Sequence, residues 1–98
     1  MLSNVYRYEF STSVAIEEAE STMLLALAAA ESLHGASEVR LDAEHAFDPV
    51  LRVCVINAAT RVGQDLNKLF AGFLAQEFGA GRFHVERLGG GQPASTAV

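Results

Sequence analysis

The apolar residues of this chain recur every two positions in some segments and at helical spacing in others, and the order of those segments is the strongest restriction on the fold. Between Val5 and Phe10 the residues alternate, with Tyr6, Tyr8 and Phe10 on one side. A period of two is the pattern of a strand with one buried face. We therefore expect a strand over residues 5–10 whose aromatic side faces the core.

Two longer segments carry helical spacing. The first begins near Val14 and is expected to end at Gly35, because glycine commonly terminates helices. Its apolar face holds Ile16, Ala19, Met23, Leu27, Ala30 and His34. The second follows Thr60 as its N-cap and ends at Gly79. Its wide apolar stripe, centred near Phe73, holds Val62, Leu66, Leu69, Phe70, Phe73, Leu74 and Phe78.

Three further strands are predicted, over residues 38–47, 51–59 and 83–88. The segment 51–59 is apolar on both faces, which favours a central place in the sheet. A three-residue turn over residues 48–50 would join the first two of these strands. That loop length pairs Phe47 with Leu51, His45 with Val53 and Ala43 with Val55, all on the core side. It leaves Arg52, Cys54 and Ile56 on the outer face.

The resulting order is strand, helix, strand, strand, helix, strand. This order predicts an α+β fold of the ferredoxin-like βαββαβ type, a four-stranded antiparallel sheet with two helices on one face. The first and third strands would be central. The alternative is another small α+β sheet with a different strand order. We expect a single domain over residues 1–88 and a flexible tail over residues 89–98, since GGGQPASTAV has no apolar period.

Composition and charge exclude several classes of function. The chain has 98 residues, is 50% hydrophobic and carries a net charge of −5, with its few basic residues scattered. Nucleic-acid binding needs clustered positive charge, so no nucleic acid is expected. The most apolar run, residues 23–30, is too short to cross a membrane. One cysteine and no visible export signal favour a soluble protein of the cytoplasm.

No catalytic or metal-binding pattern stands out. The spacing of His34, His45 and His84 matches no metal motif. Cys54 lies in mid-strand, without the helix N-terminus or neighbouring base that activates a thiol, so it is interpreted as a packing residue. No catalytic residue and no cofactor are predicted, and a non-catalytic role is favoured over an enzyme.

Two functions remain open. The first is a protein-interaction or oligomerisation module, because the helices would leave one sheet face uncovered. The charged residues expected on that face are Arg7, Glu9, Arg40, Asp42, Glu44, Arg52, His84 and Glu86. The expected partner is a second copy, forming a symmetric dimer, or another protein. The candidate interface residues are Leu25, Ala29, Arg7, Arg40 and Arg52; Leu24 and Leu25 both fall outside the apolar stripe of the first helix.

The alternative function is binding of a small molecule or anion at the N-termini of the two helices. The residues expected to converge there are Asn57, Thr60, Arg61, Gly63, Gln64, Ser11, Thr12 and Ser13. Backbone N–H groups at a helix N-terminus favour anions. The nearby carboxylates of Glu17, Glu18 and Asp65 cancel much of that field, and helix capping alone would also explain these residue types.

Overall fold

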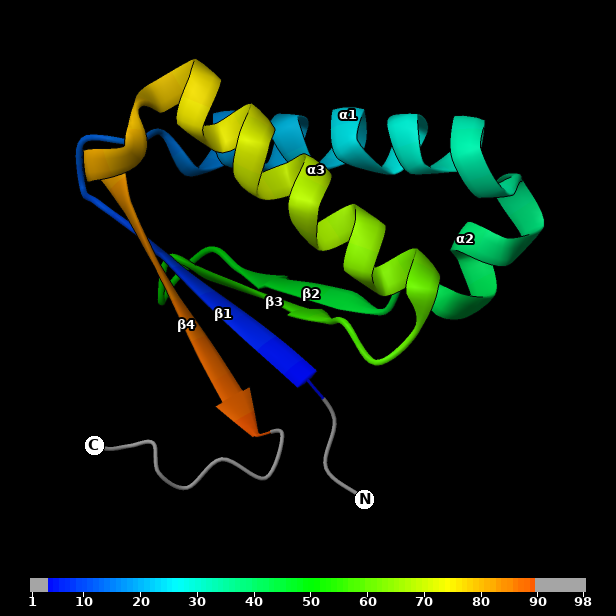
Figure 1. The fold of residues 1–98 in the computed structure, drawn as a ribbon. Coiled ribbons are helices and arrows are strands. Elements are labelled where there is room, and N and C mark those ends of the chain that lie inside the picture. Colours follow the sequence, from blue (N-terminus) through cyan, green and yellow to red (C-terminus); the bar gives the residue numbers. More distant parts are fainter. Residues whose placement is uncertain (1–3, 90–98) are drawn as a thin grey trace.

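A computed structural model describes residues 4–89 (Figure 1). The strands are β1 (Asn4–Phe10), β2 (His45–Asp48), β3 (Val53–Asn57) and β4 (Phe83–Gly89). The helices are α1 (Ile16–His34), α2 (Ala36–Asp42) and α3 (Arg61–Phe78), and a short 3₁₀ turn, η1 (Ala80–Arg82), precedes β4. The expected tail lies outside the described residues, apart from Gly89, which belongs to β4.

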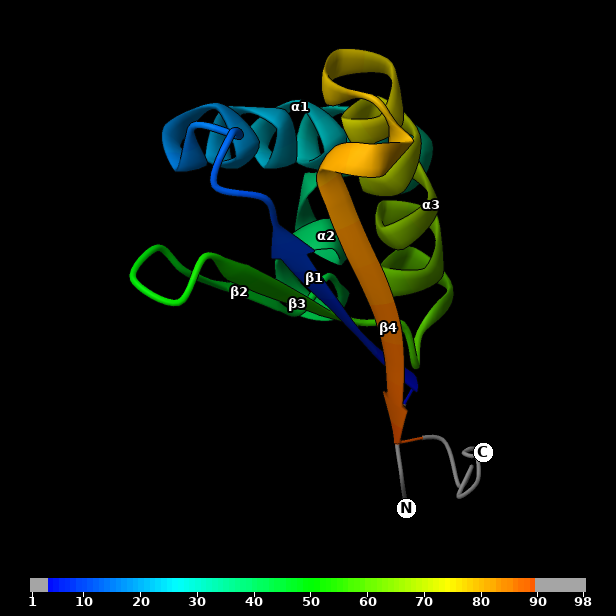
Figure 2. The same cartoon turned by 90° about the vertical axis from the view of Figure 1, so that its left-hand side faces the viewer.

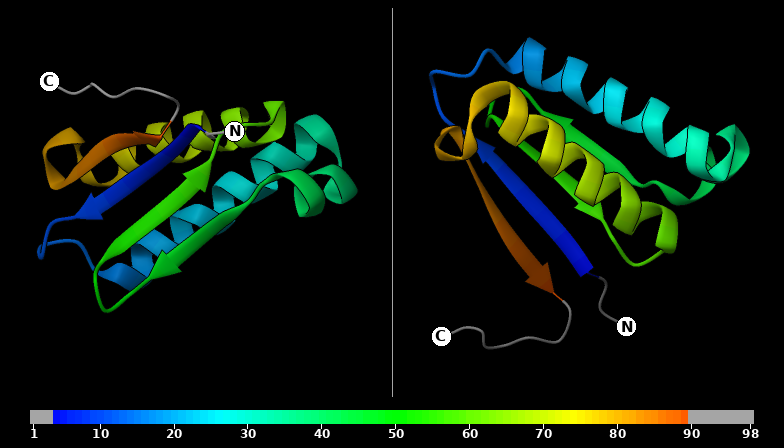
Figure 3. Two further views of the ribbon diagram at one scale, coloured as in Figure 1. Left: turned by 90° about the horizontal axis from the view of Figure 1, so that it is seen from below. Right: turned by 45° about the horizontal axis from the view of Figure 1, so that its top comes forward.

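The four strands form one antiparallel sheet in the order β2-β3-β1-β4. The α+β class and the central places of β1 and β3 are confirmed. The long helices α1 and α3 lie side by side over the same face of the sheet (Figures 1 and 2). Within the described residues no element covers the opposite face, which is open in Figure 3.

The aromatic side of β1 faces the helices, as its alternation predicts. Tyr8 is 0% exposed and Phe10 4%. The rings of Tyr8 and Phe70 from α3 pack edge to face at a centroid distance of 5.0 Å. The ring of Phe10 stacks on Phe47 from β2 at 5.9 Å. Rings from three elements therefore meet at the centre of the core, in the offset and edge-on arrangements that aromatic pairs prefer.

The prediction of a strand over residues 38–47 is wrong for its first half, which forms α2. Val39 and Ala43 are buried, but Leu41 between them is 81% exposed. The buried spacing is therefore four residues, one helical turn, and not the alternation of a strand. Gly35, with a φ of 91°, ends α1 and lets the chain turn directly into this second helix. Of the predicted strand only residues 45–47 remain, and β2 extends one residue beyond them to Asp48.

The predicted register of the β2–β3 hairpin is also wrong. The loop has four residues, 49–52, and pairs Phe47 with Cys54 and His45 with Ile56. The Asp48 carboxylate holds this loop, because its Oδ1 accepts hydrogen bonds from the backbone N–H groups of Val50 and Leu51 at 3.0 and 3.1 Å. The even loop length reverses the expected faces.

Cys54 and Ile56 consequently point into the core and are 0% exposed, whereas Val53 and Val55 face the uncovered side. Arg52 lies in the loop with a φ of 60°, a conformation that non-glycine residues seldom adopt. Its carbonyl oxygen accepts a hydrogen bond from the N–H of Phe10 at 3.0 Å. The loop is thereby attached to the end of β1.

The prediction for α3 is confirmed at both ends. Thr60 Oγ1 accepts a hydrogen bond from Gly63 N–H at 2.9 Å, and Gly79 follows the last turn with a φ of 92°. By contrast, α1 begins at Ile16, two residues later than expected, and its N-cap Ala15 offers no capping side chain. The centre of the α3 stripe also differs: Phe70 is fully buried and Phe73 only partly.

We predict that Phe70→Ala lowers the free energy of unfolding by about 3–5 kcal/mol, because it removes a fully buried ring and leaves a cavity against Tyr8 and Phe10. Phe73→Ala, a truncation of the same size on the same helix, costs less because its ring is partly exposed. Urea unfolding followed by circular dichroism measures both values. Equal losses would contradict this assignment of the core.

Candidate functional site

The eight residues expected to form one ligand site fall into two groups at opposite ends of the sheet. Because β1 and β3 are antiparallel, the end of β1 lies beside the start of β3, where Glu9 pairs with Val53. Ser11, Thr12 and Ser13 follow β1 at that end. Asn57 ends β3 beside Val5, at the other end of β1, and Thr60, Arg61, Gly63 and Gln64 follow there. The expected convergence is wrong, since it requires parallel strands.

The polar groups of Asn57 and Thr60 already form hydrogen bonds within the fold. The amide of Asn57 donates to Glu44 Oε1 at 3.0 Å and accepts from Ala59 N–H at 2.9 Å. The Thr60 hydroxyl donates to the Asp42 carbonyl at 2.9 Å while capping α3. These bonds join the start of α3 to the end of α2, so they position elements, as capping residues do. Arg61 and Gln64 are exposed on the first turn of α3.

Steric crowding explains why residue 63 is a glycine. A Cβ at this position would overlap the backbone carbonyl oxygen of Asn57 and crowd Thr60 Oγ1. The missing side chain therefore lets the first turn of α3 lie directly against the end of β3. The glycine is explained by packing, without a ligand.

Arginines from two other elements hold the loop at the Ser11 end. Arg52 Nη2 donates to the carbonyl oxygens of Ser11, at 2.7 Å, and of Val14. Arg82 Nη1 donates to Ser13 Oγ at 3.2 Å, and its carbonyl accepts from Ser11 N–H at 2.9 Å. Arg52 is therefore not on the outer sheet face where the sequence placed it. Its Nε is buried and has no hydrogen-bond partner among residues 4–89.

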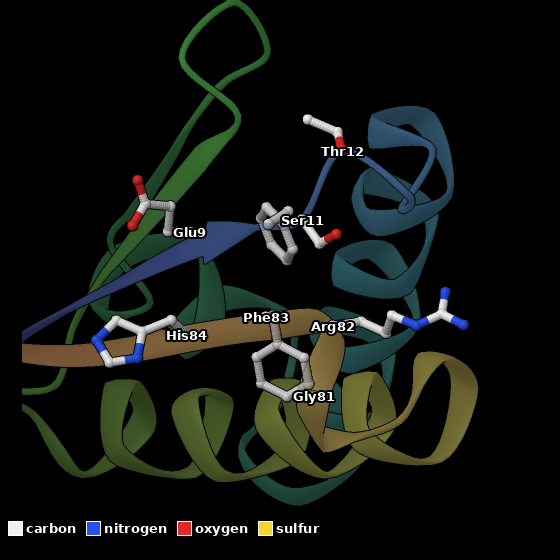
Figure 4. Close-up of a pocket in the computed structure, with 8 residues that line it drawn as sticks. Glu9, Ser11, Thr12, Gly81, Arg82, Phe83 and His84 are labelled. Atoms are coloured by element: carbon white, nitrogen blue, oxygen red, sulfur yellow. The ribbon is translucent and has the colours of Figure 1, made fainter.

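Beside this loop is a shallow hollow of about 530 Å³, shown in Figure 4. Its lining residues are Glu9, Phe10, Ser11, Thr12, Gly81, Arg82, Phe83 and His84. The hollow brings hydroxyls, an imidazole and a carboxylate to one end of the sheet. Among these described residues no hydrogen bond joins His84 to either hydroxyl of Ser11 or Thr12, so the hollow contains no nucleophile paired with a base.

The buried titratable groups are packing residues. Burial raises the pKa of the Cys54 thiol from 9.0 to about 12, so the thiol stays protonated and unreactive. Burial also raises the pKa of Tyr8, with smaller contributions from Cys54 and Tyr6. The Tyr8 hydroxyl donates to Asn67 Oδ1 at 2.6 Å, which satisfies the polar atom inside the core.

The three histidines lie in separate places. His34 Nε2 is 2.8 Å from Asp65 Oδ2, joining the end of α1 to α3. His45 Nδ1 is 2.8 Å from the Ala43 carbonyl, and His84 is exposed on β4. Residues 4–89 contain no group of three or more potential ligands able to hold a metal ion. Nor does any helix in that range have the length and apolarity needed to cross a membrane.

The uncovered sheet face is less charged than expected. Arg40 and Asp42 belong to α2, Glu44 precedes β2, and Arg52 is in the hairpin loop. Of the predicted charged set, Arg7, Glu9, His84 and Glu86 remain on this face. Apolar residues accompany them at Val5, Val53, Val55 and Leu88. Arg7 and Glu9 approach within 3.9 Å.

Three leucines of α1 are exposed. Leu24, Leu25 and Leu33 are 67%, 64% and 65% exposed. Ala28 is exposed and Ala29 partly exposed between them. We call Leu24, Leu25, Ala28 and Ala29 the α1 outer face. Leu33 follows the buried Ala26 by seven residues, two helical turns, so it lies on the other side of the helix. The sequence indicated Leu24, Leu25 and Ala29; Ala28 was missed, although it follows Leu24 by four residues.

The second long helix provides an internal comparison. On α3 the exposed side chains are short or polar: Arg61, Gln64, Lys68, Ala75, Gln76 and Glu77. No large apolar side chain of α3 is exposed, within the residues that the structure describes. The two helices lie in the same layer over the same sheet, so the leucines of α1 are not a requirement of the architecture.

Comparison with known proteins gives no assignment: no protein-family model, curated protein or solved structure matches this chain.

We predict that Gly63→Ala lowers the free energy of unfolding by several kcal/mol, because the added methyl meets backbone atoms that cannot move aside cheaply. Gly72→Ala, also within α3, is the control. Nothing lies within 4 Å of a Cβ there, so the change should be neutral or stabilising. A Gly63→Ala variant as stable as the parent would contradict the close approach to Asn57.

We predict that stability falls at alkaline pH partly because of Cys54. Between the ordinary thiol pKa of 9.0 and the raised value of about 12, the unfolded chain loses this proton while the folded chain keeps it. Unfolding is therefore favoured as pH rises through this range, with a maximal slope of about 1.4 kcal/mol per pH unit for one proton. Urea midpoints measured from pH 8 to pH 11 should fall less steeply for Cys54→Ala. Parallel pH profiles would refute the assignment.

Proposed function

We propose that this chain is a non-catalytic protein-interaction module that binds its partner through the α1 outer face. One observation carries the proposal: Leu24 and Leu25 on the outer side of α1 are 67% and 64% exposed, while α3 exposes no large apolar side chain. Contiguous exposed apolar surface of this kind marks interaction sites in folded proteins.

The gain available from covering this face is substantial. Full burial of one leucine side chain contributes about 1.5–3 kcal/mol. Leu24 and Leu25, each about two-thirds exposed, therefore offer about 2–4 kcal/mol before the cost of association. The fold itself does not use this energy, because the buried side of α1 is formed by other residues: Ala19, Thr22, Met23, Ala26 and Ala30.

We also propose that the fold is of the ferredoxin-like type. Its support is the pair of central strands β1 and β3, the edge strands β2 and β4, and the two long helices on one face. The additional helix α2 departs from the simple βαββαβ order. This assignment adds no function, because one fold of this kind serves many unrelated activities. The proposed location is the cytoplasm, where the lone thiol of Cys54 would stay reduced.

The test is site-specific photocrosslinking in the native cell. A photoreactive amino acid replaces Ala28 on the α1 outer face or, as the matched control, the exposed Ala75 on α3. We expect a discrete adduct only from position 28, because of α1 and α3 only α1 exposes large apolar side chains. An adduct of twice the chain mass identifies a second copy, and any other mass a different protein. Absence of an adduct from position 28, or equal adducts from both positions, would count against the proposal.

A further inference from the structure

The strand β4 has one edge without a partner strand within residues 4–89. It is the last strand of the sheet order and pairs with β1 along its whole length, without a bulge (Figure 2). It has seven residues, whereas β2 at the opposite edge has four. It contains neither proline nor lysine, two residues that commonly prevent edge strands from pairing further. An edge of this kind can accept another strand.

The direction of the backbone groups on this edge follows from a hydrogen bond beside it. Ser11 N–H donates to the Arg82 carbonyl at 2.9 Å, which continues the β1–β4 register by one pair. Hydrogen-bonded and non-hydrogen-bonded pairs alternate along an antiparallel ladder, so the even-numbered residues of β4 direct their N–H and C=O groups toward β1. Phe83, Val85 and Arg87 therefore direct theirs outward, where a new strand could bond to them.

The helices also leave part of β4 uncovered. Cys54, Tyr8 and Val85 lie in one row across β3, β1 and β4, on the helix side of the sheet. Cys54 and Tyr8 are 0% exposed and Val85 is 36% exposed, so this row is buried as far as β1 and open at β4. A strand added beside β4 would extend the row and cover the Val85 side chain.

The sequence of β4 is complementary to itself in one register. Two β4 strands related by a twofold axis are antiparallel, and the axis passes beside one residue of each strand. Axes at Val85, Glu86 and Arg87 keep most of each strand paired. The axes at Glu86 and Arg87 set each of these residues directly against its own copy, and like charges in that position destabilise a pair. The axis at Val85 instead sets Val85 against Val85 and His84 against Glu86, twice.

The charges on the uncovered face fit the same register. Within the chain Glu86 lies opposite Arg7, and His84 lies opposite Glu9. With the axis at Val85, a row across the two sheets would therefore run from Arg7 and Glu86 of one copy to His84 and Glu9 of the other. No two like charges are neighbours in this row, and the twofold axis repeats it.

From these observations we infer that a second copy of the chain pairs with β4 edge to edge, antiparallel about Val85, so that the two sheets form one continuous sheet. Any extended strand could bond to the outward backbone groups, but β4 itself supplies the complementary charges and the matching valine. The contact is confined to one strand, so the dimer is weak and depends on concentration. This edge is separate from the α1 outer face, and the inference does not rest on the proposed function.

The test is sedimentation equilibrium of the full chain at pH 7, from about 10 µM to about 500 µM. We expect a monomer–dimer equilibrium. His84→Glu and Glu86→Lys each place like charges in opposition twice, so each should weaken the dimer about tenfold. Gln76→Glu and Glu77→Lys make the same charge changes on the exposed side of α3 and should have no effect. Circular dichroism confirms that every variant is folded.

A mixture of the two β4 variants tests the register directly. In a mixed dimer the glutamate introduced at position 84 faces the lysine introduced at position 86, and Glu86 of the first variant faces His84 of the second. We therefore expect the mixture to dimerise at least as tightly as the parent chain, although each variant alone does not. If His84→Glu alone had no effect, or if mixing restored nothing, the register about Val85 would be wrong.

The remaining outcomes separate this inference from the proposed function. A parent chain that is monomeric at every concentration overturns the inference and leaves the α1 outer face open to another protein. A dimer that Leu25→Ser dissolves and the β4 variants leave intact also overturns it, and places the interface on the α1 outer face. A dimer that the β4 variants weaken and Leu25→Ser leaves intact supports the inference, whatever photocrosslinking at position 28 shows.

Discussion

The core depends on a tyrosine that is polar at one end and fully buried. Tyr8 lies on a central strand with no exposed surface, so its hydroxyl needs a partner inside the protein. Asn67 of α3 supplies it at 2.6 Å, and Phe70, three residues further along the same helix, meets the tyrosine ring. A hydrogen bond and an aromatic contact thus fix both the position and the rotation of α3 over β1. With α3 fixed, α1 is confined to the remaining width of the sheet.

The two long helices fill their part of the core with different side chains. α3 fills the centre with large residues such as Leu66 and Phe70, whereas α1 contributes Ala19, Ala26 and Ala30 with Met23. Small buried residues let α1 lie close to its neighbours, and the 2.8 Å contact of His34 with Asp65 links its last turn to α3. The bulk that α1 lacks on its buried side is present on its outer side, at Leu24 and Leu25. These leucines therefore contribute nothing to the packing of the core.

Much of the fold could be predicted from local signals. The alternation around Tyr8, the Thr60 cap and the stops at Gly35 and Gly79 each express a backbone or packing requirement within a few residues, and each was found in the structure. The segment before β2 could not be assigned in this way. The spacing of Val39 and Ala43 fits a strand and a helix equally well, and only the exposure of Leu41 decides between them. The hairpin register depended on the Asp48 side chain, which stabilises a loop one residue longer than expected.

The prediction of the ligand site failed for a different reason, the direction of the two central strands. Ser11 and Asn57 each have the residue type expected near a helix N-terminus, but two antiparallel central strands carry them to opposite ends of the sheet. Composition alone cannot reveal this separation, because it is a property of strand direction. The helical spacing of α1, by contrast, does contain the information that Leu25 faces outward. The spacing of α1 alone does not show how this helix differs from α3, which has a similar length and position but a polar exposed side. That contrast shows that this architecture can fold with a polar outer side on a long helix, so the packing of the core does not account for the exposed leucines of α1.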